Sequence, residues 1–441
     1  MIDGPLRASS RIESPYSPLT RQILPILALL VSTAFLLAGN DLHSLLLPLR
    51  GAAAGFSTNE LGLVGAGWAA GFVLGCLTAP IVVRRVGHIR AFACSAACAA
   101  VVILLNGIFV LPLAWIFLRV CSGFFLAGAF MVIESWLNER ATNESRGTIF
   151  AVYLTVTYLA ITAGQFVIAA GDPRTATLFM AGAVFFCLAV LPTALSTAAS
   201  PQPLARAKLD LRKLFANSPV AVLTVALVGV INGAFGSLAP VFGTRAGLST
   251  PLIALMMGIT VVSGALTQLP AGRISDLTDR RYVIAVIAVC AGLAGLAIFV
   301  LNPASPAAIL ALTGAYGALT YPLYGLAVAQ ANDYADASEF VAVSGGLLLL
   351  YGVGTMVGPL AASTAMTAIG PQALFLVTAA SHALIAGYAV YRTFQRAPIP
   401  ENARDAYRTV PAQTSTPQTA ALDPRADDLT LLDRETHIAV K

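Results

Sequence analysis

Charged side chains are rare inside the apolar stretches of this chain, so the few that occur there are candidates for chemistry. Asp41 and Arg119 are the clearest, in the first and fourth stretches. A charge at a bilayer centre costs about 2.5–3.5 kcal/mol on insertion scales, and such residues often mark ion or substrate pathways. At 1.5 Å of helix rise per residue, both lie roughly 9 Å below the same surface. Opposite charges at one depth predict a functional pair, and a static pair that only neutralises two charges is the alternative.

Asp41 has polar neighbours that fit the same role. His43 could relay a proton, although a polar residue near the end of a span is often only interfacial. Asn40 lies three residues before His43 and therefore shares its helix face. Asn232 lies in a second copy of the sequence pattern around Asn40, and two facing amides would bind a hydroxyl or amide group of a solute. Hydrogen bonding between helices, worth about 0.6 kcal/mol, is an equal alternative for these amides.

Amide and phenol side chains in other apolar stretches are further candidates for substrate binding. Pro322 lies between tyrosines of one stretch and predicts a bent helix there, because proline cannot continue the hydrogen bonding of a helix. Packing is the commoner role for each of these side chains taken alone. The candidates are Gln165, Gln268, Tyr316, Tyr321 and Tyr324.

A repeated pattern of turn residues divides the chain into two halves. Parallel repeats in a strongly apolar chain are typical of secondary transporters, in which one half moves against the other. The pattern is N-x7-P-x2-G-x3-G-x-S, first at Asn40, Pro48, Gly51, Gly55 and Ser57, and again at Asn232, Pro240, Gly243, Gly247 and Ser249.

The composition predicts an all-α integral membrane protein. Hydrophobic residues make up 57% of the chain and charged residues 11%, whereas a soluble domain carries about 25% charged residues. A spanning helix needs about 20 apolar residues. We expect twelve transmembrane helices in two pseudo-symmetric six-helix bundles, at about 22–47, 58–82, 91–111, 113–134, 148–170, 175–196, 218–242, 251–272, 283–301, 305–330, 340–363 and 372–394.

Lysine and arginine are distributed unevenly among the connections between these spans. Of the 26 basic residues, Arg50, Arg174 and Arg245 fall on one side of the membrane, and Arg119 lies within a span. The others lie on the side that carries both termini, which the positive-inside rule places in the cytoplasm. The formal charge of +5 therefore reflects topology and not a nucleic-acid partner.

The expected organisation has five parts. Polar terminal segments low in apolar residues are expected to be disordered, and part of the linker, 204–215, fits a short interfacial helix. The parts are a disordered cytoplasmic N-terminus (1–20), an N-terminal six-helix bundle (21–196), a cytoplasmic linker (197–217), a C-terminal six-helix bundle (218–395) and a disordered cytoplasmic tail (396–441).

The connection after the eighth span resembles that of a known family. Gly272, Asp276, Arg280 and Arg281 resemble the loop signature G-x3-D-R/K-x-G-x-R/K-R/K of the major facilitator superfamily. In the fourth span, Arg119-Val-Cys-Ser-Gly123 is similar to the R-x3-G signature of that superfamily. The resemblance covers about residues 20–395 and implies the major facilitator fold in a bacterial inner membrane. Stretches similar to the YcaD-like group of bacterial facilitators are RRVGHIRAF (84–92), ESWLNERATNESRG (134–147), AQANDY (329–334) and GLLLLYGVG (346–354).

The resemblance implies a gate on the cytoplasmic side. Asp276 would meet a helix N-terminus, whose dipole favours a negative charge by about 0.3–1 kcal/mol, although simple charge anchoring is the alternative. In the first-half copy of the motif Arg84 stands where the acid belongs, so Glu134 or Glu139 is expected to supply the carboxylate. The gating candidates are Arg84, Arg85, Arg90, Glu134, Arg146, Gly272, Asp276, Arg280 and Arg281.

The resemblance also implies a function, because in that fold an acid on the first span and an arginine on the fourth recur as a coupling pair. We expect a secondary active transporter, coupled to protons, that moves a small polar organic solute by alternating access and acts as a monomer. Efflux of amphipathic drugs or toxic metabolites is an alternative, weakened because Gly164-Gln165 replaces the glycine-proline step usual in drug antiporters. A membrane sensor that transports nothing is a second alternative.

Enzyme and metal motifs are missing from the sequence. It has no Walker loop, no HExxH and no GxSxG, and its six cysteines have no CxxC spacing. We therefore expect no enzymatic activity, no cofactor and no metal, with the solute, protons and the lipid bilayer as the partners.

Overall fold

The structure is a computed structural model, and its described part is helical with no strand. It describes residues 23, 26–142, 145–195, 210–335 and 339–397, and the single positions 407, 409, 416 and 419. The predictions for residues 1–20, for linker residues 197–209 and for most of the tail therefore lie outside the described residues. The helices are α2 (Leu27–Ala53), α3 (Thr58–Val86), α4 (His88–Ile108), α5 (Pro112–Arg140), α6 (Arg146–Val167), η2 (Ile168–Ala170), α7 (Thr177–Ala194), α8 (Leu211–Asn217), α9 (Pro219–Arg245), α10 (Thr250–Leu277), α11 (Arg280–Leu301), α12 (Pro306–Thr320), α13 (Pro322–Asn332), α14 (Phe340–Ala368) and α15 (Ala373–Thr393).

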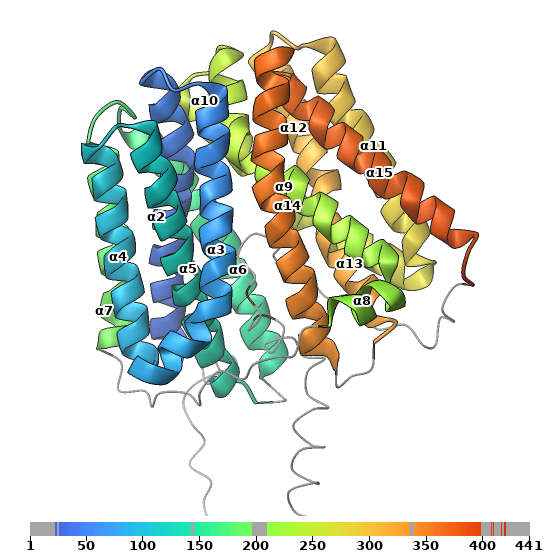
Figure 1. Cartoon of the computed structure of the whole chain (residues 1–441), viewed down its shortest axis with the longest axis horizontal. Coiled ribbons are helices and arrows are strands. Elements are labelled where there is room, and N and C mark those ends of the chain that lie inside the picture. Colours follow the sequence, from blue (N-terminus) through green and yellow to red (C-terminus); the bar gives the residue numbers. More distant parts are fainter. Residues whose placement is uncertain are drawn as a thin grey trace, which may run out of the picture.

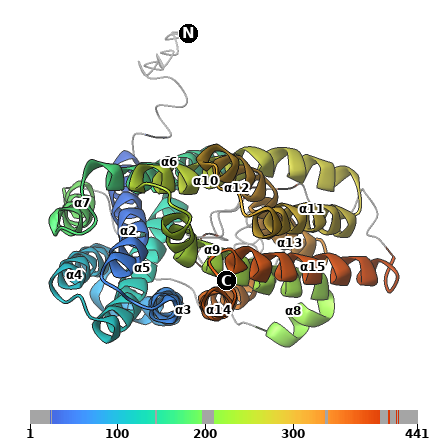
Figure 2. The same cartoon turned by 90° about the horizontal axis from the view of Figure 1, so that it is seen from above.

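These helices form two bundles that stand side by side (Figures 1 and 2). Helices α2 to α7 make the N-terminal bundle and α9 to α15 the C-terminal bundle, as the sequence repeat predicts. Helix α8, within the expected linker, lies at one end of the bundles, near the start of α9. We call this end the linker side, and the other end, which carries the turns at Gly55 and Gly247, the opposite side.

Eleven of the described helices are long and apolar enough to cross a membrane. The remaining span, the tenth along the chain, is divided at Tyr321, because α12 ends at Thr320 and α13 begins at Pro322. Proline has no N–H to donate, and its ring collides with the preceding turn. The bend predicted at Pro322 is therefore a break between two helices, and the prediction of twelve spans is confirmed.

The repeated sequence pattern corresponds to a repeated turn. Gly55 and Gly247 have φ values of 84° and 79°, in the left-handed region that glycine adopts without strain. Two residues later, Ser57 and Ser249 are the N-caps of α3 and α10. The Ser57 hydroxyl accepts a hydrogen bond from the Glu60 N–H while the Glu60 carboxylate accepts one from the Ser57 N–H, which is a capping box. The pattern thus fixes where the second helix of each half begins.

Helix α2 extends beyond its predicted end at residue 47 and continues to Ala53, with Pro48 accommodated inside it. Gly51, in the last turn, lies directly against the side chains of Leu61 and Trp115. Asp41 consequently lies farther from the end of α2 than Arg119 lies from the start of α5. Their spacing from the helix ends therefore no longer predicts equal depth.

Glycines bring neighbouring helices into close contact. Gly71 on α3 faces the backbone of Val120 on α5, and Gly123 on α5 faces the backbone of Trp68 on α3. In the second half, Gly354 on α14 lies against the backbone of α9 in the same way. Small residues at helix crossings allow the backbones to approach within a membrane, where apolar surfaces alone provide little association energy.

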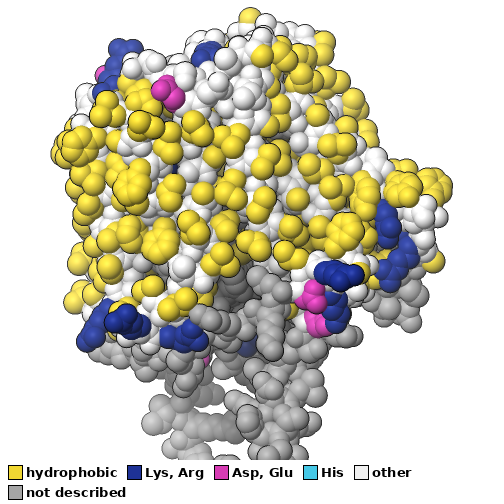
Figure 3. Space-filling view, viewed as in Figure 1, with side chains coloured by type: hydrophobic (Ala, Val, Ile, Leu, Met, Phe, Trp, Pro, Cys, Tyr) yellow, Lys and Arg dark blue, Asp and Glu magenta, His cyan; other side chains and the backbone are white. Residues whose placement is uncertain are grey.

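The surface of the bundles explains the composition. On the face seen in Figure 3, hydrophobic side chains cover the middle, and Lys and Arg gather toward the ends. Leu266, Leu293 and Phe117 are among the large hydrophobic side chains that are well exposed. Such an apolar belt suits a lipid environment, because lipid tails and not water then contact these side chains.

Candidate transport site

A cavity of about 150 Å³ lies between the two bundles. Both halves contribute to its wall, so movement of one bundle against the other would change its shape. Its lining contains both polar and apolar side chains, which suits an organic solute with polar groups. Its polar lining is Asn40, Asp41, Ser44, Trp68, Arg119 and Gln165 from the N-terminal half, and Asn232, Ser237, Tyr321, Tyr351 and Thr355 from the C-terminal half.

Asp41 and Arg119 both line this cavity, as the sequence predicts. Asn40 Nδ2 donates to Asp41 Oδ2 at 3.3 Å, and the Gln165 side chain also lies within hydrogen-bonding reach of this carboxylate. No nitrogen–oxygen contact of 4.0 Å or less joins Asp41 to Arg119. The two charges therefore interact across the cavity without forming an ion pair in contact.

Arg119 is held by the wall of the N-terminal half. Its side chain is only 6% exposed, and its guanidinium carbon lies 5.9 Å from the centre of the Trp68 ring. A cation over an indole face is stabilised by the quadrupole of the ring. Trp68 was not among the predicted site residues, although its place between Gly67 and Gly71, on the glycine face of α3 that packs against α5, could have indicated its position.

The C-terminal half lines the cavity with one amide and two phenol side chains, Asn232, Tyr321 and Tyr351. Asn232 Nδ2 donates to the Tyr351 hydroxyl at 3.3 Å, and both residues line the cavity. Tyr321, at the break between α12 and α13, lines it as well. Tyr324 lies behind this wall, with its ring 5.3 Å from that of Tyr351 in an edge-to-face arrangement. Tyr351 was also missed, and the signal for it was the motif GLLLLYGVG, in which it is the only polar aromatic residue.

Two other predicted residues lie away from this cavity. His43 Nε2 forms a hydrogen bond of 3.0 Å with Asn106 Oδ1 on α4, inside the N-terminal bundle. Tyr316 packs in an aromatic cluster of the C-terminal bundle with Phe235 and Phe375. Neither residue is part of the cavity lining. Their predicted roles in proton coupling and substrate binding stay predictions.

Gln268 connects the two halves instead of lining the cavity. Its Nε2 donates to the hydroxyl of Tyr158 at 2.9 Å, which joins α10 of one bundle to α6 of the other. This contact is one of several that hold the bundles together. A substrate role for Gln268 stays a prediction.

The two bundles also contact each other at the opposite side. Arg245 Nη2 at the end of α9 donates to Thr58 Oγ1 at 2.7 Å, and Thr367 Oγ1 on α14 donates to Asn59 Oδ1 at 3.3 Å. Gly62 of α3 lies directly against Ser363 of α14. The close packing of α3 against α14 at Gly62 and the two hydrogen bonds join the halves at this end.

Comparison with known proteins agrees with this architecture. The sequence profile of the Major Facilitator Superfamily matches residues 29–335. The chain belongs to the major facilitator superfamily. Uncharacterised MFS-type transporters named YcaD, from Salmonella newport and Salmonella typhi, are each 27% identical to it over 363 residues, covering 80% of this chain and 92% of theirs.

Solved structures share the fold of this facilitator. The nucleoside transporter NupG superposes with a TM-score of 0.66 at 15% identity, covering 86% of this chain and 98% of NupG. A bacterial homologue of the human lysosomal transporter Spinster, in an inward-facing and occupied conformation, superposes with a TM-score of 0.67 at 14% identity. It covers 88% of this chain and 99% of that one. The facilitator is thus a membrane transporter by family and not an enzyme.

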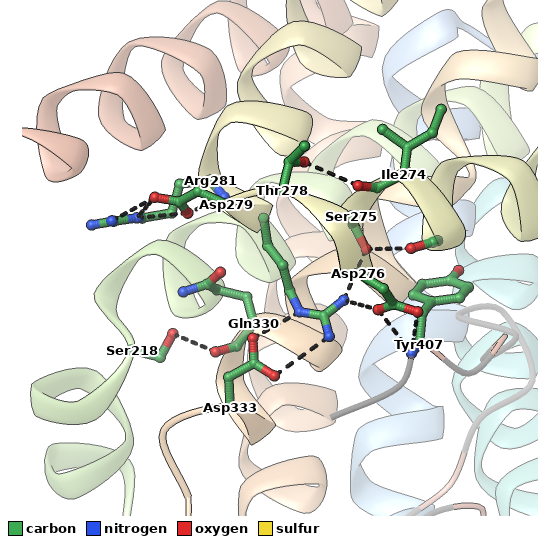
Figure 4. A network of polar contacts seen from close by, with 12 residues as sticks. Ser218, Ile274, Ser275, Asp276, Thr278, Asp279, Arg281, Gln330, Asp333 and Tyr407 are labelled. Atoms are coloured by element: carbon green, nitrogen blue, oxygen red, sulfur yellow. Dashed lines mark hydrogen bonds and ion pairs between the residues drawn. The ribbon is translucent and has the colours of Figure 1, made fainter. Parts of the chain in front are cut away.

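The second-half motif of the facilitator forms a network of charges at the linker side (Figure 4). Arg280 is nearly inaccessible and binds Asp276 at 2.8 Å and Asp333 at 2.7 Å. Arg281 pairs with Asp279 at 2.6 Å and donates to the carbonyl oxygens of Arg392 and Arg396. The motif therefore ties the ends of α10, α11 and α13 to one another within the C-terminal bundle.

The first-half residues predicted to gate are arranged differently. Arg84, Arg85 and Arg90 are exposed at the linker side, whereas Arg146 is buried. Glu134 is completely buried, and Tyr153 donates to its Oε1 at 3.0 Å.

The partners of Glu134 differ from the expected arginines. Among the described residues, Glu134 is hydrogen-bonded by Tyr153, Thr416 and Thr419. It does not supply a carboxylate to the exposed arginines. A gating role for this set stays a prediction.

Proposed function

We propose that this facilitator is a proton-coupled secondary transporter that moves a small polar organic solute by alternating access. The observation that carries the proposal is the ionisable carboxylate of Asp41 in the wall of a cavity that also contains the buried cation Arg119. Charged side chains within a membrane protein are costly and are kept where they act on ions or substrates. Asp41 can hold and release a proton where the solute binds.

The coupling follows from the charges of this pair. Ionised Asp41 balances the field of Arg119 across the cavity, and protonated Asp41 leaves that field uncompensated. A solute that interacts with Arg119 therefore experiences two different sites, depending on the proton. The proton gradient then sets whether Asp41 is protonated on each side of the membrane. In this way it determines which form of the transporter, protonated or ionised, changes between the inward-open and outward-open states.

The orientation belongs to the same proposal. The linker side carries α8 and the arginines of both loop motifs, so the positive-inside rule places it in the cytoplasm. We expect the protein in the bacterial inner membrane as a monomer, with both termini cytoplasmic. The hydrogen bonds at the opposite side then close the periplasmic end, and the solute exchanges with the cytoplasm in this conformation.

Transport against a gradient tests this proposal. Proteoliposomes that contain the native protein and an internal pH dye are offered a panel of sugars, amino acids, nucleosides and organic acids under an imposed pH gradient. We expect at least one solute to accumulate and to move protons with it, and collapsing the gradient with nigericin should reduce accumulation at least tenfold. Accumulation that is unchanged by nigericin would exclude proton coupling.

A further inference from the structure

The cavity contains polar atoms that the protein does not satisfy. Arg119 Nε and Nη1 and Trp68 Nε1 are buried donors without a hydrogen-bond partner in the described part of the chain. Asn40 Oδ1 and Gln165 Oε1 are buried acceptors in the same condition. All four residues line the cavity, so a ligand bound there can supply the missing hydrogen-bond partners.

The charge of these atoms indicates what the ligand must carry. Arg119 is fixed in charge, more than nine-tenths buried, and has no carboxylate of the described residues within 4.0 Å. A guanidinium presents its N–H groups as a planar fork that fits the two oxygens of a carboxylate. The Trp68 ring lies 5.9 Å from the guanidinium carbon, and its N–H, which has no partner among the described residues, adds a third donor.

We propose that the cavity binds a small organic carboxylate that carries a hydroxyl or amino group close to its carboxylate. The carboxylate accepts hydrogen bonds from Arg119 and Trp68, and the neighbouring hydroxyl or amino group donates to Asn40 and Gln165. This assignment rests on the proposed transport function and names the class of its solute.

The rest of the cavity fits the carbon skeleton of such a solute. Leu45, Val64 and Ile161 line it from the N-terminal half, and Phe235 and Met257 from the C-terminal half. Apolar walls of this kind favour an organic anion over an inorganic one. An inorganic anion has no carbon skeleton to cover these side chains, which would then contact water or the anion's charge.

A carboxylate at Arg119 also explains how coupling would work. With Asp41 protonated, Arg119 is left as the uncompensated charge of the pair, and a carboxylate neutralises it. Binding of the proton and binding of the carboxylate therefore favour each other, and each increases the affinity for the other by the same factor. One proton would move with one monocarboxylate, so that no net charge crosses the membrane.

Binding to the purified protein tests the solute class without any need for transport. The melting temperature in detergent is measured with a panel of small 2-hydroxy and 2-amino carboxylates, each compared with its neutral amide. We expect at least one carboxylate to raise the melting temperature of the native protein, and its amide to have no effect. Arg119→Gln should weaken binding of that carboxylate about 10- to 100-fold, and Arg119→Lys should weaken it less.

Arg174→Gln is the matched control, because Arg174 is an exposed arginine of the same half outside every predicted site, and it should bind the carboxylate as the native protein does. Stabilisation by neutral compounds only, stabilisation by no carboxylate at all, or full carboxylate binding by Arg119→Gln would each overturn the assignment. Stabilisation by chloride or phosphate alone would do the same in favour of an inorganic anion. Proton-driven uptake of a neutral solute would leave the proposed function intact while excluding a carboxylate.

A second inference concerns the C-terminal tail and rests on different residues. The main-chain N–H of Tyr407 donates to both carboxylate oxygens of Asp276 at 3.0 Å, as Figure 4 shows. The ring of Tyr407 lies directly against Gly272 of α10 and Gly325 of α13, where any side chain would collide with it. Tyr407 is itself buried. The tail is thereby attached to the motif residues of the C-terminal bundle.

The same tail contacts the N-terminal bundle. Thr419 Oγ1 donates to Glu134 Oε1 at 2.7 Å, and Thr416 Oγ1 donates to Glu134 Oε2. Thr416 and Thr419 are also joined to each other, since the Thr416 N–H donates to Thr419 Oγ1 at 2.8 Å. Both threonines are buried, like Glu134. The carboxylate of Glu134, buried in the bundle, thus accepts hydrogen bonds from these two threonines.

We infer that Tyr407, Thr416 and Thr419, the described contact residues of the C-terminal segment, form an autoinhibitory strap at the linker side. Asp276 belongs to the C-terminal bundle and Glu134 to the N-terminal bundle, and alternating access requires these two ends to approach when the linker side closes. Tyr407, Thr416 and Thr419 occupy surfaces of both ends, so closure must displace them. Release of these three residues from their contacts would then permit the transport cycle.

Distance measurements test the strap in the full-length protein without a solute. Spin labels are attached to Glu139→Cys and Leu277→Cys, two exposed positions at the linker-side ends of α5 and α10, after the six native cysteines have been replaced. The variant Tyr407→Ala/Thr416→Val/Thr419→Val removes the ring and both hydroxyls. We expect it to increase the ratio of the short-distance to the long-distance population at least tenfold, because both threonine hydrogen bonds to the Glu134 carboxylate and the packing of the Tyr407 ring are lost.

Thr409→Val is the matched control, because Thr409 is a half-buried tail threonine that forms no hydrogen bond within the described residues. It should leave the distance distribution as in the native protein. A distribution in the triple variant that coincides with the native one would overturn the inference. An equal change in the Thr409→Val protein would show that the tail acts without these specific contacts.

Discussion

Asp41→Asn should lower accumulation driven by a pH gradient at least tenfold, while exchange of labelled for unlabelled solute continues. An amide keeps the size of the carboxylate and one oxygen that can accept a hydrogen bond, but it cannot take up or release a proton. Exchange requires only the movement of the loaded transporter, whereas accumulation requires proton release on one side. Both rates are measured in proteoliposomes with the solute identified by the uptake panel.

Asp172→Asn provides the control, because Asp172 is an exposed acid in the connection before α7. It should leave both rates as in the native protein. If Asp41→Asn accumulates solute as well as the native protein does, the proton travels elsewhere. His43 and Glu134, two further buried ionisable residues, would then be the next candidates.

Gly71→Ala should destabilise the folded protein by about 1–3 kcal/mol, the usual cost of overpacking a close-packed interior. A Cβ on Gly71 would overlap the carbonyl oxygen of Val120, which is a backbone atom and cannot turn aside as a side chain can. Helices α3 and α5 would have to separate along their crossing. We expect the melting temperature in detergent to fall by about 3–10 °C.

Gly387→Ala is the matched substitution, because a Cβ at Gly387 in α15 has no neighbour within 4 Å. Alanine in a helix is favoured over glycine by about 0.8–1.0 kcal/mol, so this protein should melt at the native temperature or slightly above it. Equal melting temperatures of the two variants would contradict the role assigned to the crossing of α3 and α5.

Local features of the sequence were sufficient for the architecture. The apolar stretches predict twelve spans because a bilayer requires about 20 apolar residues for each crossing. The repeated pattern around Gly55 and Gly247 predicts equivalent turns, because positive φ and an N-cap are requirements of a few adjacent residues. The charges of Asp41 and Arg119 could be identified in the same way, since an ionisable residue in an apolar stretch is conspicuous without any tertiary information.

Only the tertiary structure decided which polar side chains meet at the cavity. Asp41 lines it, whereas His43, two residues later on the same helix, points to Asn106 of α4. Tyr321 lines it because the chain breaks there, whereas Tyr316, one and a half turns earlier, lies in an aromatic cluster.

The contacts of the tail could not be found from the sequence either. Tyr407 and Thr419 lie in a polar segment whose composition is typical of disorder, and their partners Asp276 and Glu134 are distant in the chain. Helix periodicity determines which residues share a face, but the neighbour of that face depends on packing between segments far apart in sequence. The sequence by itself therefore determined the spans, the turns and the two buried charges, and long-range packing decided which side chains surround them.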